Sequence, residues 1–217
     1  MQHRLLIIGA GGFGRELLGW ALGVAPGARD WAIGGFLDAN PAALDGFPCE
    51  YGILGDPSCY APAPNDVFLP AIGHSRTKLR ICRSLKSRGG QFATLIHPSA
   101  ILGPGCRVGE GSVLCPGATL TTNVTLGDFV VMNTHSGCGH DVVVGDGCTF
   151  SSYVDVTGAV RLGEGVFLGS HAAVLPGLTI GDFAAIGAGS VVVRNVPARA
   201  TVMGVPAKQV AGFGDTQ

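Results

Sequence analysis

Two short segments of this 217-residue chain contain residues that could take part in catalysis or ligand binding. His140 is followed directly by Asp141, so an imidazole, which gives and takes protons near neutral pH, stands beside a carboxylate. Residues 9–14 read Gly-Ala-Gly-Gly-Phe-Gly and match GxGxxG, a turn whose backbone N–H groups can bind phosphate at the start of a helix. The sequence therefore offers a candidate proton-transfer pair and a candidate anion-binding turn.

Hydrophobic patterning around the glycine-rich turn predicts a small α/β unit. Apolar runs predict strands at residues 4–8, 32–37 and 67–72. The turn leads into a helix at 15–22, the second strand ends in Asp38, and a basic helix follows at 75–88. About 95 residues suffice for one βαβαβ half, which favours a mononucleotide over NAD as the bound group. The alternative for the turn is a glycine-rich turn without a ligand. The basic helix is expected only to face solvent.

From residue 96 onward the sequence repeats every six residues. Seventeen positions at this spacing, from Ile96 to Val192, are apolar, and the positions four residues after each are small or apolar. In every third hexad a glycine precedes an acid, at Glu110, Asp128, Asp146, Glu164 and Asp182. Three hexads therefore form one coil, a pattern typical of a hexapeptide β-helix with coils about 4.8 Å apart. An ordinary β-sandwich would not keep this phase.

The composition agrees with such a repeat and narrows the function. Glycine contributes 36 residues, and 13% of residues are charged, against roughly 25% in ordinary domains. A net charge of −1 argues against a basic nucleic-acid-binding surface. The mean hydropathy of +0.39 arises without a run of ~18 uncharged apolar residues. With no signal-peptide pattern and seven unpaired-looking cysteines, we expect a cytoplasmic protein with reduced thiols and no membrane partner.

The distribution of charge within the repeat singles out Asp141. Ten charged residues lie between 96 and 195, and nine of them stand two or five residues after an inward position. Asp141 alone stands three residues after one, so it departs from the solubilising pattern directly beside His140. This favours a functional pair over a solvated one. His135, Tyr153 and His171 share a column, each three hexads after the one before, which predicts stacked surface side chains.

Several motifs together resemble the NeuD/PglD group of sugar acetyltransferases, which have the left-handed β-helix of hexapeptide acyltransferases. The motifs are IIGAGGFGRE at 7–16, AIG at 71–73, LIHPSA at 95–100, Asn133 with His140-Asp141, and GVPAK at 204–208. The resemblance implies a Rossmann-like nucleotide-sugar-binding domain at 1–95 and a left-handed parallel β-helix acyltransferase domain at 96–196. It also implies a tail at 197–217 that contributes to acetyl-CoA binding, and a homotrimer with active sites between neighbouring β-helices.

The resemblance further implies roles for individual residues. His140 would be the general base oriented by Asp141, the N–H of Gly158 would bind the thioester oxygen, and Asn133 would lie near the reacting group. Acetyl-CoA would contact Thr149, Gly158, Ser170 and Ala188. The nucleotide sugar would contact Gly11, Gly12, Phe13, Asp38 and Gly73. At positions 13 and 149 this chain has phenylalanine and threonine where some relatives have histidine. No metal is expected.

The expected function is N-acetylation, by direct transfer from acetyl-CoA, of a nucleotide-linked amino sugar of the 4-amino-4,6-dideoxyhexose type in bacterial polysaccharide biosynthesis. One alternative is O-acetylation of sialic acid or another sugar, and a second is a nucleotide-sugar-binding protein without catalysis. A third is a metal hydratase that uses His135 and His140. It is disfavoured because the third ligand position falls at Ser99, and His97 is out of register by two residues.

Overall fold

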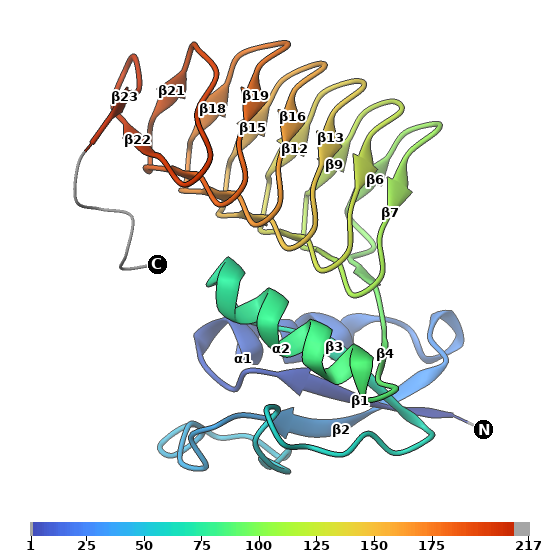
Figure 1. Ribbon diagram of the computed structural model, residues 1–217. Coiled ribbons are helices and arrows are strands. Elements are labelled where there is room, and N and C mark those ends of the chain that lie inside the picture. The colour runs from blue at the N-terminus through green and yellow to red at the C-terminus, as the bar shows by residue number, and fades with distance from the viewer. Residues whose placement is uncertain (1, 211–217) are drawn as a thin grey trace.

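The computed structural model describes residues 2–210, which form an α/β unit followed by a β-helix (Figure 1). The first unit is a four-stranded parallel sheet with strand order β2-β1-β3-β4. Its elements are β1 (His3–Ile8), α1 (Gly12–Gly23), the 3-10 turn Pro26–Ala28, β2 (Trp31–Leu37), β3 (Asp66–Pro70), α2 (Ser75–Ser87) and β4 (Gln91–Phe92).

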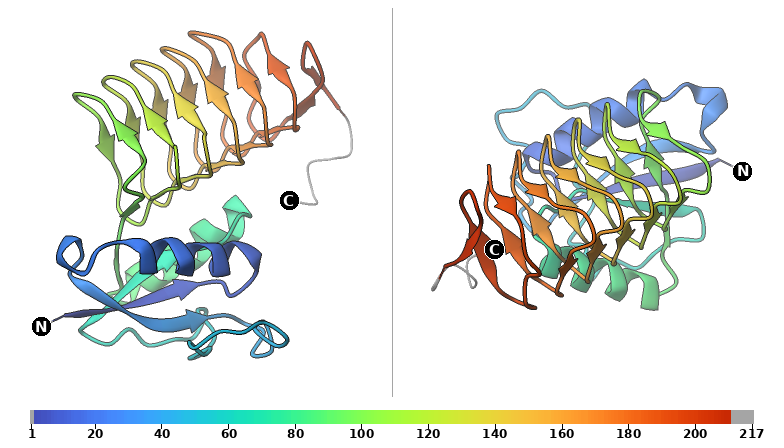
Figure 2. Two further views of the ribbon diagram at one scale, coloured as in Figure 1. Left: turned by 180° about the vertical axis from the view of Figure 1, so that it is seen from behind. Right: turned by 90° about the horizontal axis from the view of Figure 1, so that it is seen from above.

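The two helices cover opposite faces of this sheet because the central strand is apolar on both sides. Along β1, Leu5 and Ile7 belong to the cluster that contains α1, whereas Leu6 and Ile8 belong to the cluster that contains α2. Successive strand residues point to opposite faces, so a continuous apolar run buries both. Figure 1 shows α2 in front of the sheet, and the left view of Figure 2, from behind, shows α1 in front.

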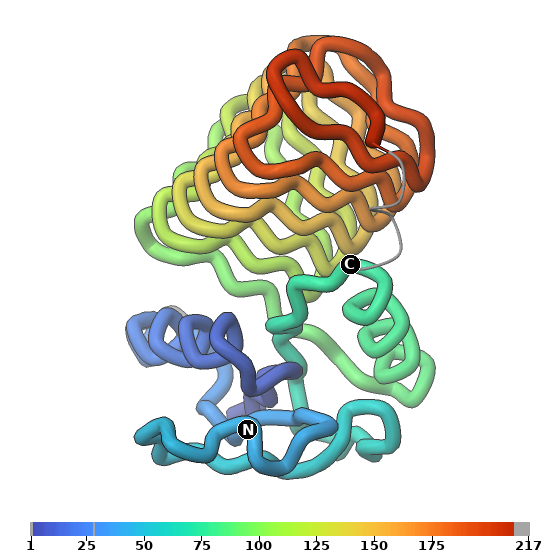
Figure 3. Tube along the Cα trace, turned by 90° about the vertical axis from the view of Figure 1, so that its left-hand side faces the viewer, coloured from blue at the N-terminus to red at the C-terminus, as the bar shows by residue number. Residues whose placement is uncertain are grey.

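The β-helix consists of triangular coils with three parallel sheets, named here faces 1, 2 and 3 (Figure 3). Face 1 contains β5 (Leu95–Ile96), β8 (Val113–Leu114), β11 (Val131–Met132), β14 (Thr149–Phe150), β17 (Phe167–Leu168), β20 (Ala185–Ile186) and β22 (Thr201–Met203), with β23 (Lys208–Gln209) antiparallel to β22. Face 2 contains β6 (Ile101–Leu102), β9 (Thr119–Leu120), β12 (Gly137–Cys138), β15 (Asp155–Val156), β18 (Ala173–Val174) and β21 (Val191–Val192). Face 3 contains β7 (Arg107–Val108), β10 (Thr125–Leu126), β13 (Val143–Val144), β16 (Arg161–Leu162) and β19 (Thr179–Ile180).

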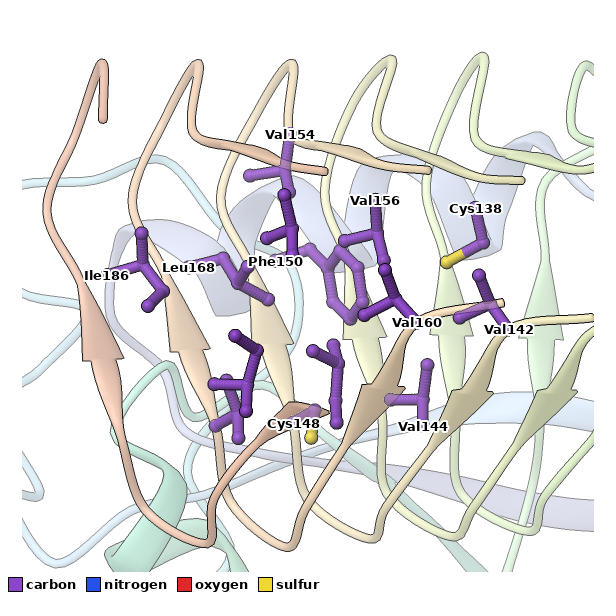
Figure 4. Close-up of a cluster of buried hydrophobic side chains, with 14 of the residues drawn as sticks. Cys138, Val142, Val144, Cys148, Phe150, Val154, Val156, Val160, Leu168 and Ile186 are labelled. Atoms are coloured by element: carbon purple, nitrogen blue, oxygen red, sulfur yellow. The ribbon is translucent and has the colours of Figure 1, made fainter. Parts of the chain in front are cut away.

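The expected fold class is confirmed: an α/β half domain, as the N-terminal pattern predicts, is followed by a parallel β-helix, as the hexad repeat predicts, with the left-handed twist that the family resemblance implies. Strands of successive coils pair at a shift of three hexads, as in Val131 with Thr149, so three hexads form one coil. The two apolar columns fill the interior, where Phe150 and Leu168 are fully buried (Figure 4). At the first coil Leu102 is 40% exposed, because no earlier coil stacks on that end of the β-helix.

The β-helix lies over the β4 edge of the sheet and over both helices (Figures 1 and 3). Val113 and Val131 of face 1 are buried in the same cluster as Leu17 of α1. On the other side, Phe129 is buried with Leu79 of α2. The two units are therefore joined by apolar contacts. Among residues 2–210 neither helix is both long and apolar enough to cross a membrane.

Candidate active site

His140 and Asp141 lie together at the corner between faces 2 and 3, called here the 2/3 corner, which in their coil comprises residues 139–142. His140 Nδ1 lies 2.8 Å from Asp141 Oδ2, and both side chains are exposed, at 69% and 55%. Asp141 has a left-handed backbone, with φ of 62°, and its N–H donates to the carbonyl of Thr122 one coil below. The contact with His140 is the main reason that the pKa of Asp141 is lowered, so this carboxylate is ionised at neutral pH.

The geometry defines which ring nitrogen of His140 is free. An ionised carboxylate only accepts hydrogen bonds, so Nδ1 must carry the proton of the neutral imidazole, and Nε2 of that neutral ring has the lone pair. Gly158 lies one coil above, and a Cβ built on it would come within 2.7 Å of His140 Cε1 and nearer still to Nε2. A glycine there therefore makes room for the imidazole. The N–H of Gly158 makes no hydrogen bond to another described residue.

Ser170 and Ala188 lie at a different corner, between faces 1 and 2, called here the 1/2 corner. Both line a cavity of about 450 Å³. Its walls are mostly small or apolar, formed by Ser151, Phe167, Gly169, Ser170, Ala185, Ile186, Gly187, Ala188, Thr201 and Met203. Asn133 belongs to the same corner, one coil before Ser151, but it does not line the cavity, and its Oδ1 accepts the N–H of Thr134 at 2.7 Å.

The expected site residues of the β-helix thus fall into two groups within one chain. His140, Asp141 and Gly158 belong to the 2/3 corner, whereas the cavity with Ser170 and Ala188 belongs to the 1/2 corner. The strands of face 2 separate the two corners in every coil. A single chain therefore does not bring His140 to this cavity.

Thr149 lies apart from both groups. It is on β14 with 6% of its surface exposed, and its Oγ1 accepts a hydrogen bond of 2.8 Å from Lys78 Nζ of α2. Lys78 is fully buried, donates also to the carbonyl of Cys148 at 3.1 Å, and has its pKa lowered to about 8 by burial. The hydroxyl of Thr149 therefore serves the contact between the α/β unit and the β-helix. The sequence alone does not distinguish Lys78, because its segment, residues 75–88, contains six basic residues.

The α/β unit contains a second cavity, of about 410 Å³, at the carboxyl ends of its central strands. It is lined by Ile8, Gly9, Leu37, Asp38, Ala39, Asp56, Pro57, Ser58, Ile72, Thr77, Arg80 and Ile81. The sheet order reverses between β1 and β3, and ligands of open α/β sheets bind outside the carboxyl ends of strands at such a point. This cavity is the candidate nucleotide site.

The glycine-rich turn divides into structural and open glycines. A Cβ on Gly14 would overlap the carbonyl of Gly9, and Gly9 itself has a left-handed φ of 103°, so both positions are fixed by packing. A Cβ on Gly11, Gly12 or Gly73 would meet nothing within 4 Å, which leaves room for a ligand to approach the backbone.

Two other expected nucleotide-site side chains have partners within the protein. Phe13 packs edge-on against Trp20, with ring centroids 6.2 Å apart. Asp38 Oδ2 accepts the N–H of Ala10 at 2.8 Å, and its Oδ1 accepts that of Asn40 at 2.8 Å. The Asp38 carboxylate therefore fixes the glycine-rich turn as well as lining the cavity.

Asp56 and Arg80 line the nucleotide cavity but were not identified from the sequence. Asp56 belongs to the long connection after β2, which returns along that strand through hydrogen bonds such as Asp38 N–H to the carbonyl of Gly55. The pKa of Asp56 is lowered, chiefly by the N–H of Ser58 and to a smaller extent by Arg80. No local motif marks these residues, because a long loop brings Asp56 back to the sheet.

The basic helix expected to face solvent instead packs against the β-helix, which corrects that expectation. Arg83 pairs with Glu164 at 2.5 Å and Asp146 at 3.4 Å. Lys86 pairs with Glu110 at 2.6 Å and Asp128 at 3.3 Å. The acids that recur once per coil therefore form a ladder along α2, at the corner between faces 3 and 1, called here the 3/1 corner.

The rings of His135, Tyr153 and His171 stack along the 1/2 corner, with centroids 5.1 and 4.9 Å apart. His135 and His140 consequently lie at different corners, so the spacing considered for a metal hydratase does not bring them together. Within residues 2–210 no group of three or more His, Cys, Asp or Glu side chains could hold a metal ion.

Comparison with known proteins agrees with this architecture. Residues 4–85 match the PglD N-terminal domain family. The chain is 31% identical to PerB from Caulobacter crescentus, solved in complex with CoA and GDP-perosamine, over 95% of this chain and 97% of that one, with a TM-score of 0.83. The acetyltransferase domain of PglB from Neisseria gonorrhoeae, in complex with acetyl coenzyme A, is 29% identical over 97% of this chain and 100% of that chain, with a TM-score of 0.86.

A curated relative, GDP-perosamine N-acetyltransferase of Escherichia coli O157:H7, is 31% identical over 96 residues, which span 43% of each protein. The arrangement of an α/β unit joined to hexapeptide coils, shared with these acetyltransferases, defines the sugar-modifying class of hexapeptide acyltransferases. The chain belongs to the NeuD/PglD-like family of this class.

Proposed function

We propose that this protein transfers an acetyl group from acetyl-CoA to the amine of a nucleotide-linked amino sugar, with His140 as general base. The observation that carries the proposal is the pairing of His140 Nδ1 with Asp141 at 2.8 Å, which leaves Nε2 as a proton acceptor beside Gly158. The likeness to PerB, solved with CoA and GDP-perosamine, supports both substrates.

In the proposed reaction, Nε2 of His140 takes a proton from the sugar amine as its nitrogen attacks the thioester carbonyl carbon. A C–N bond forms, the carbonyl oxygen gains negative charge, and the N–H of Gly158 donates a hydrogen bond to that oxygen. The C–S bond then breaks, and the proton held by His140 passes to the CoA thiolate. The ionised Asp141 stabilises the imidazolium formed in between.

For acetyl-CoA we propose the cavity at the 1/2 corner, with Ser170 and Ala188 in its wall. Thr149 is not included, because Lys78 already occupies its hydroxyl. From the proposed tail at 197–217, Thr201 and Met203 line this cavity, and residues 211–217 lie outside the described residues. No further residue of the tail is assigned.

The proposal includes a homotrimer. His140 and the cavity with Ser170 are at different corners of one chain, and a neighbouring copy could bring its 1/2 corner against the 2/3 corner of the first. Three copies around one axis would then form three equal sites. Light scattering of the purified protein tests this, and a monomer at assay concentration with full activity would contradict it.

For the nucleotide sugar we propose the cavity of about 410 Å³ in the α/β unit. Pyrophosphate would approach the open backbone at Gly11 and Gly12, at the start of α1. Asp38 and Arg80 line this cavity. Gly73 and Phe13 do not line it and are included as further proposed contacts, and the Phe13 ring packs on Trp20. The proposal places the reaction in the cytoplasm.

The deciding experiment measures CoA release from acetyl-CoA with GDP-, UDP- and dTDP-linked 4-amino sugars, their 4-hydroxy counterparts, and free sialic acid. We expect turnover with at least one amino sugar and none with its hydroxy counterpart. Turnover with sialic acid alone would replace the proposal with O-acetylation. Nucleotide-sugar binding in a thermal-shift assay, without acetyl-CoA binding or turnover, would indicate a binding protein. Zinc analysis of the same sample tests the hydratase alternative.

A further inference from the structure

The Asp141 carboxylate has a second partner besides His140. Asn123 lies one coil below Asp141, and its Nδ2 donates to Asp141 Oδ1 at 3.2 Å. The two oxygens of Asp141 are therefore engaged from two sides, one by the imidazole and one by the amide. This contact also contributes to the lowered pKa of Asp141, after that of His140.

The backbone explains why an asparagine at this position points toward Asp141. Asn123 has a left-handed φ of 56°, and its N–H donates to the carbonyl of Pro104 at 3.0 Å. Below it, a Cβ on Gly105 would overlap Asn123 Oδ1, so the glycine makes room for the amide oxygen. With the oxygen side over Gly105, the NH₂ side faces the next coil, where a carboxylate can accept its hydrogen bond.

We propose that Asn123 is a positioning residue that holds the Asp141 carboxylate in the orientation in which it binds His140. The inference rests on the proposed function, since it gives Asn123 a role only if His140 is the base. Asp141 and His140 are both exposed in the chain, so packing alone does not fix their rotamers. Two hydrogen bonds to one carboxylate restrict its rotation and thereby the direction of Nε2.

Asparagine is also a common residue at left-handed corners for reasons unrelated to catalysis. The equivalent positions of other coils allow the two explanations to be tested separately. Ala159 stands two coils above Asn123 with φ of 59°. Gly105 and Gly177 occupy equivalent positions with φ of 74° and 73°. Alanine or glycine therefore fits the backbone of this corner. Substitution at Asn123 removes the amide without forcing a new backbone conformation.

The test is a double-mutant cycle of Asn123→Ala and Asp141→Ala, with kcat and both KM values measured for each variant. We expect Asn123→Ala to lower kcat by about threefold to tenfold, with both KM values unchanged within about twofold. In the Asp141→Ala background the same substitution should cause no further loss, because its target is gone. An equal loss in both backgrounds, or no loss in either, overturns the proposal.

Three further variants keep the result interpretable. Asn123→Gly gives the same test with the least demanding left-handed residue, should the alanine variant fold poorly. Asn123→Asp places a second carboxylate against Asp141 and should lower kcat more than Asn123→Ala does. Full activity of His140→Ala would contradict the proposed function itself. An inactive His140→Ala together with an uncoupled Asn123→Ala would contradict only the role of Asn123.

Discussion

The 2/3 corner and the 3/1 corner of the β-helix have the same backbone design but carry carboxylates for different purposes. At the 3/1 corner the acids stand two residues after an inward position, where Asp128 and Asp146 accept N–H groups from the coil below at 3.0 Å. Their other oxygens pair with Arg83 and Lys86 of α2. These carboxylates therefore stabilise the stacking of successive coils and the attachment of α2.

At the 2/3 corner His140 takes the position that the acids occupy elsewhere, and Asp141 stands one residue later. That shift places the acid on the left-handed residue of the corner, from which its carboxylate reaches the imidazole instead of a backbone N–H. Among residues 2–210 neither α1 nor α2 covers this corner, and the His140 side chain is 69% exposed. The comparison teaches that a one-residue shift and the absence of a covering helix convert a structural carboxylate into a candidate catalytic one.

The largest effect is expected for His140→Ala, which removes the proposed base from the uncovered corner. We expect kcat to fall by ~10²–10⁴, the usual contribution of a positioned acid or base. The matched control is His3→Ala, at the start of β1. Steady-state kinetics with the best nucleotide sugar measures this. A loss of kcat below about threefold would mean that the 2/3 corner, like the 3/1 corner, has no catalytic role.

Substitution of Lys78 tests the covered side, where its ammonium is buried between α2 and β14. The pKa of about 8 lies below the ordinary 10.5, so the unfolded chain binds more protons between these pH values. The stability of the wild type relative to Lys78→Met should therefore rise between pH 8 and 10.5, by up to about 3 kcal/mol.

Urea unfolding of both proteins at pH 7, 8.5 and 10 measures this difference. Lys86→Met is the control, because its ion pairs raise the pKa of Lys86 and its contribution persists until pH exceeds the ordinary value of 10.5. A wild-type-minus-Lys78→Met difference that stays constant with pH would show that the Lys78 ammonium is solvated rather than buried.

Gly158→Ala should impair activity more than stability, because the new Cβ would press on the His140 ring, which is exposed and free to move aside. A displaced base costs about 10–100-fold in kcat. Gly137→Ala, in β12 of face 2 next to this corner, is the control, since its Cβ would come no closer than 3.8 Å to Thr119 O. Kinetics and melting temperatures should separate the two variants; equal kcat values would argue against a tight fit of His140 under Gly158.

The smallest effect is expected for Arg83→Met at the acid ladder. The Arg83 side chain is 49% exposed, and exposed ion pairs contribute about 0.2–1 kcal/mol and are screened by salt. We expect a slightly lower unfolding free energy in 50 mM salt, a smaller difference in 500 mM salt, and unchanged kcat. A large loss of activity would mean that the ladder contributes to the site as well as to the attachment of α2.

Much of the candidate site follows from a fixed repeat. Because one coil is three hexads, the sequence already placed Gly158 above His140, and the single charge out of pattern identified Asp141. The repeat did not expose Asn123, although it stands one coil before Asp141, because asparagine is unremarkable at a corner. Its role became visible only with the direction of its amide.

Where the structure differs from the expectations drawn from the sequence, the cause is a contact between the α/β unit and the β-helix. These two regions are distant in the sequence, so no local pattern relates them. The family resemblance implies a cofactor contact at Thr149, whereas in the structure α2 covers this residue and Lys78 donates a hydrogen bond to its hydroxyl. The acids at Asp146 and Glu164 set the coil period in the sequence, but their pairing with Arg83 depends on where α2 comes to rest.

By itself the sequence determined the β-helix, its coil length and the stacking of His140 under Gly158, because a strict six-residue period admits one register. The tertiary structure was needed to show which corner α2 covers and which carboxylates pair with Arg83 and Lys86 of that helix. It was also needed to show that His140 and the cavity with Ser170 lie at separate corners. The physical reason is that a repeat fixes neighbours along its own axis, whereas the packing of a separate α/β unit depends on long-range apolar and ionic contacts.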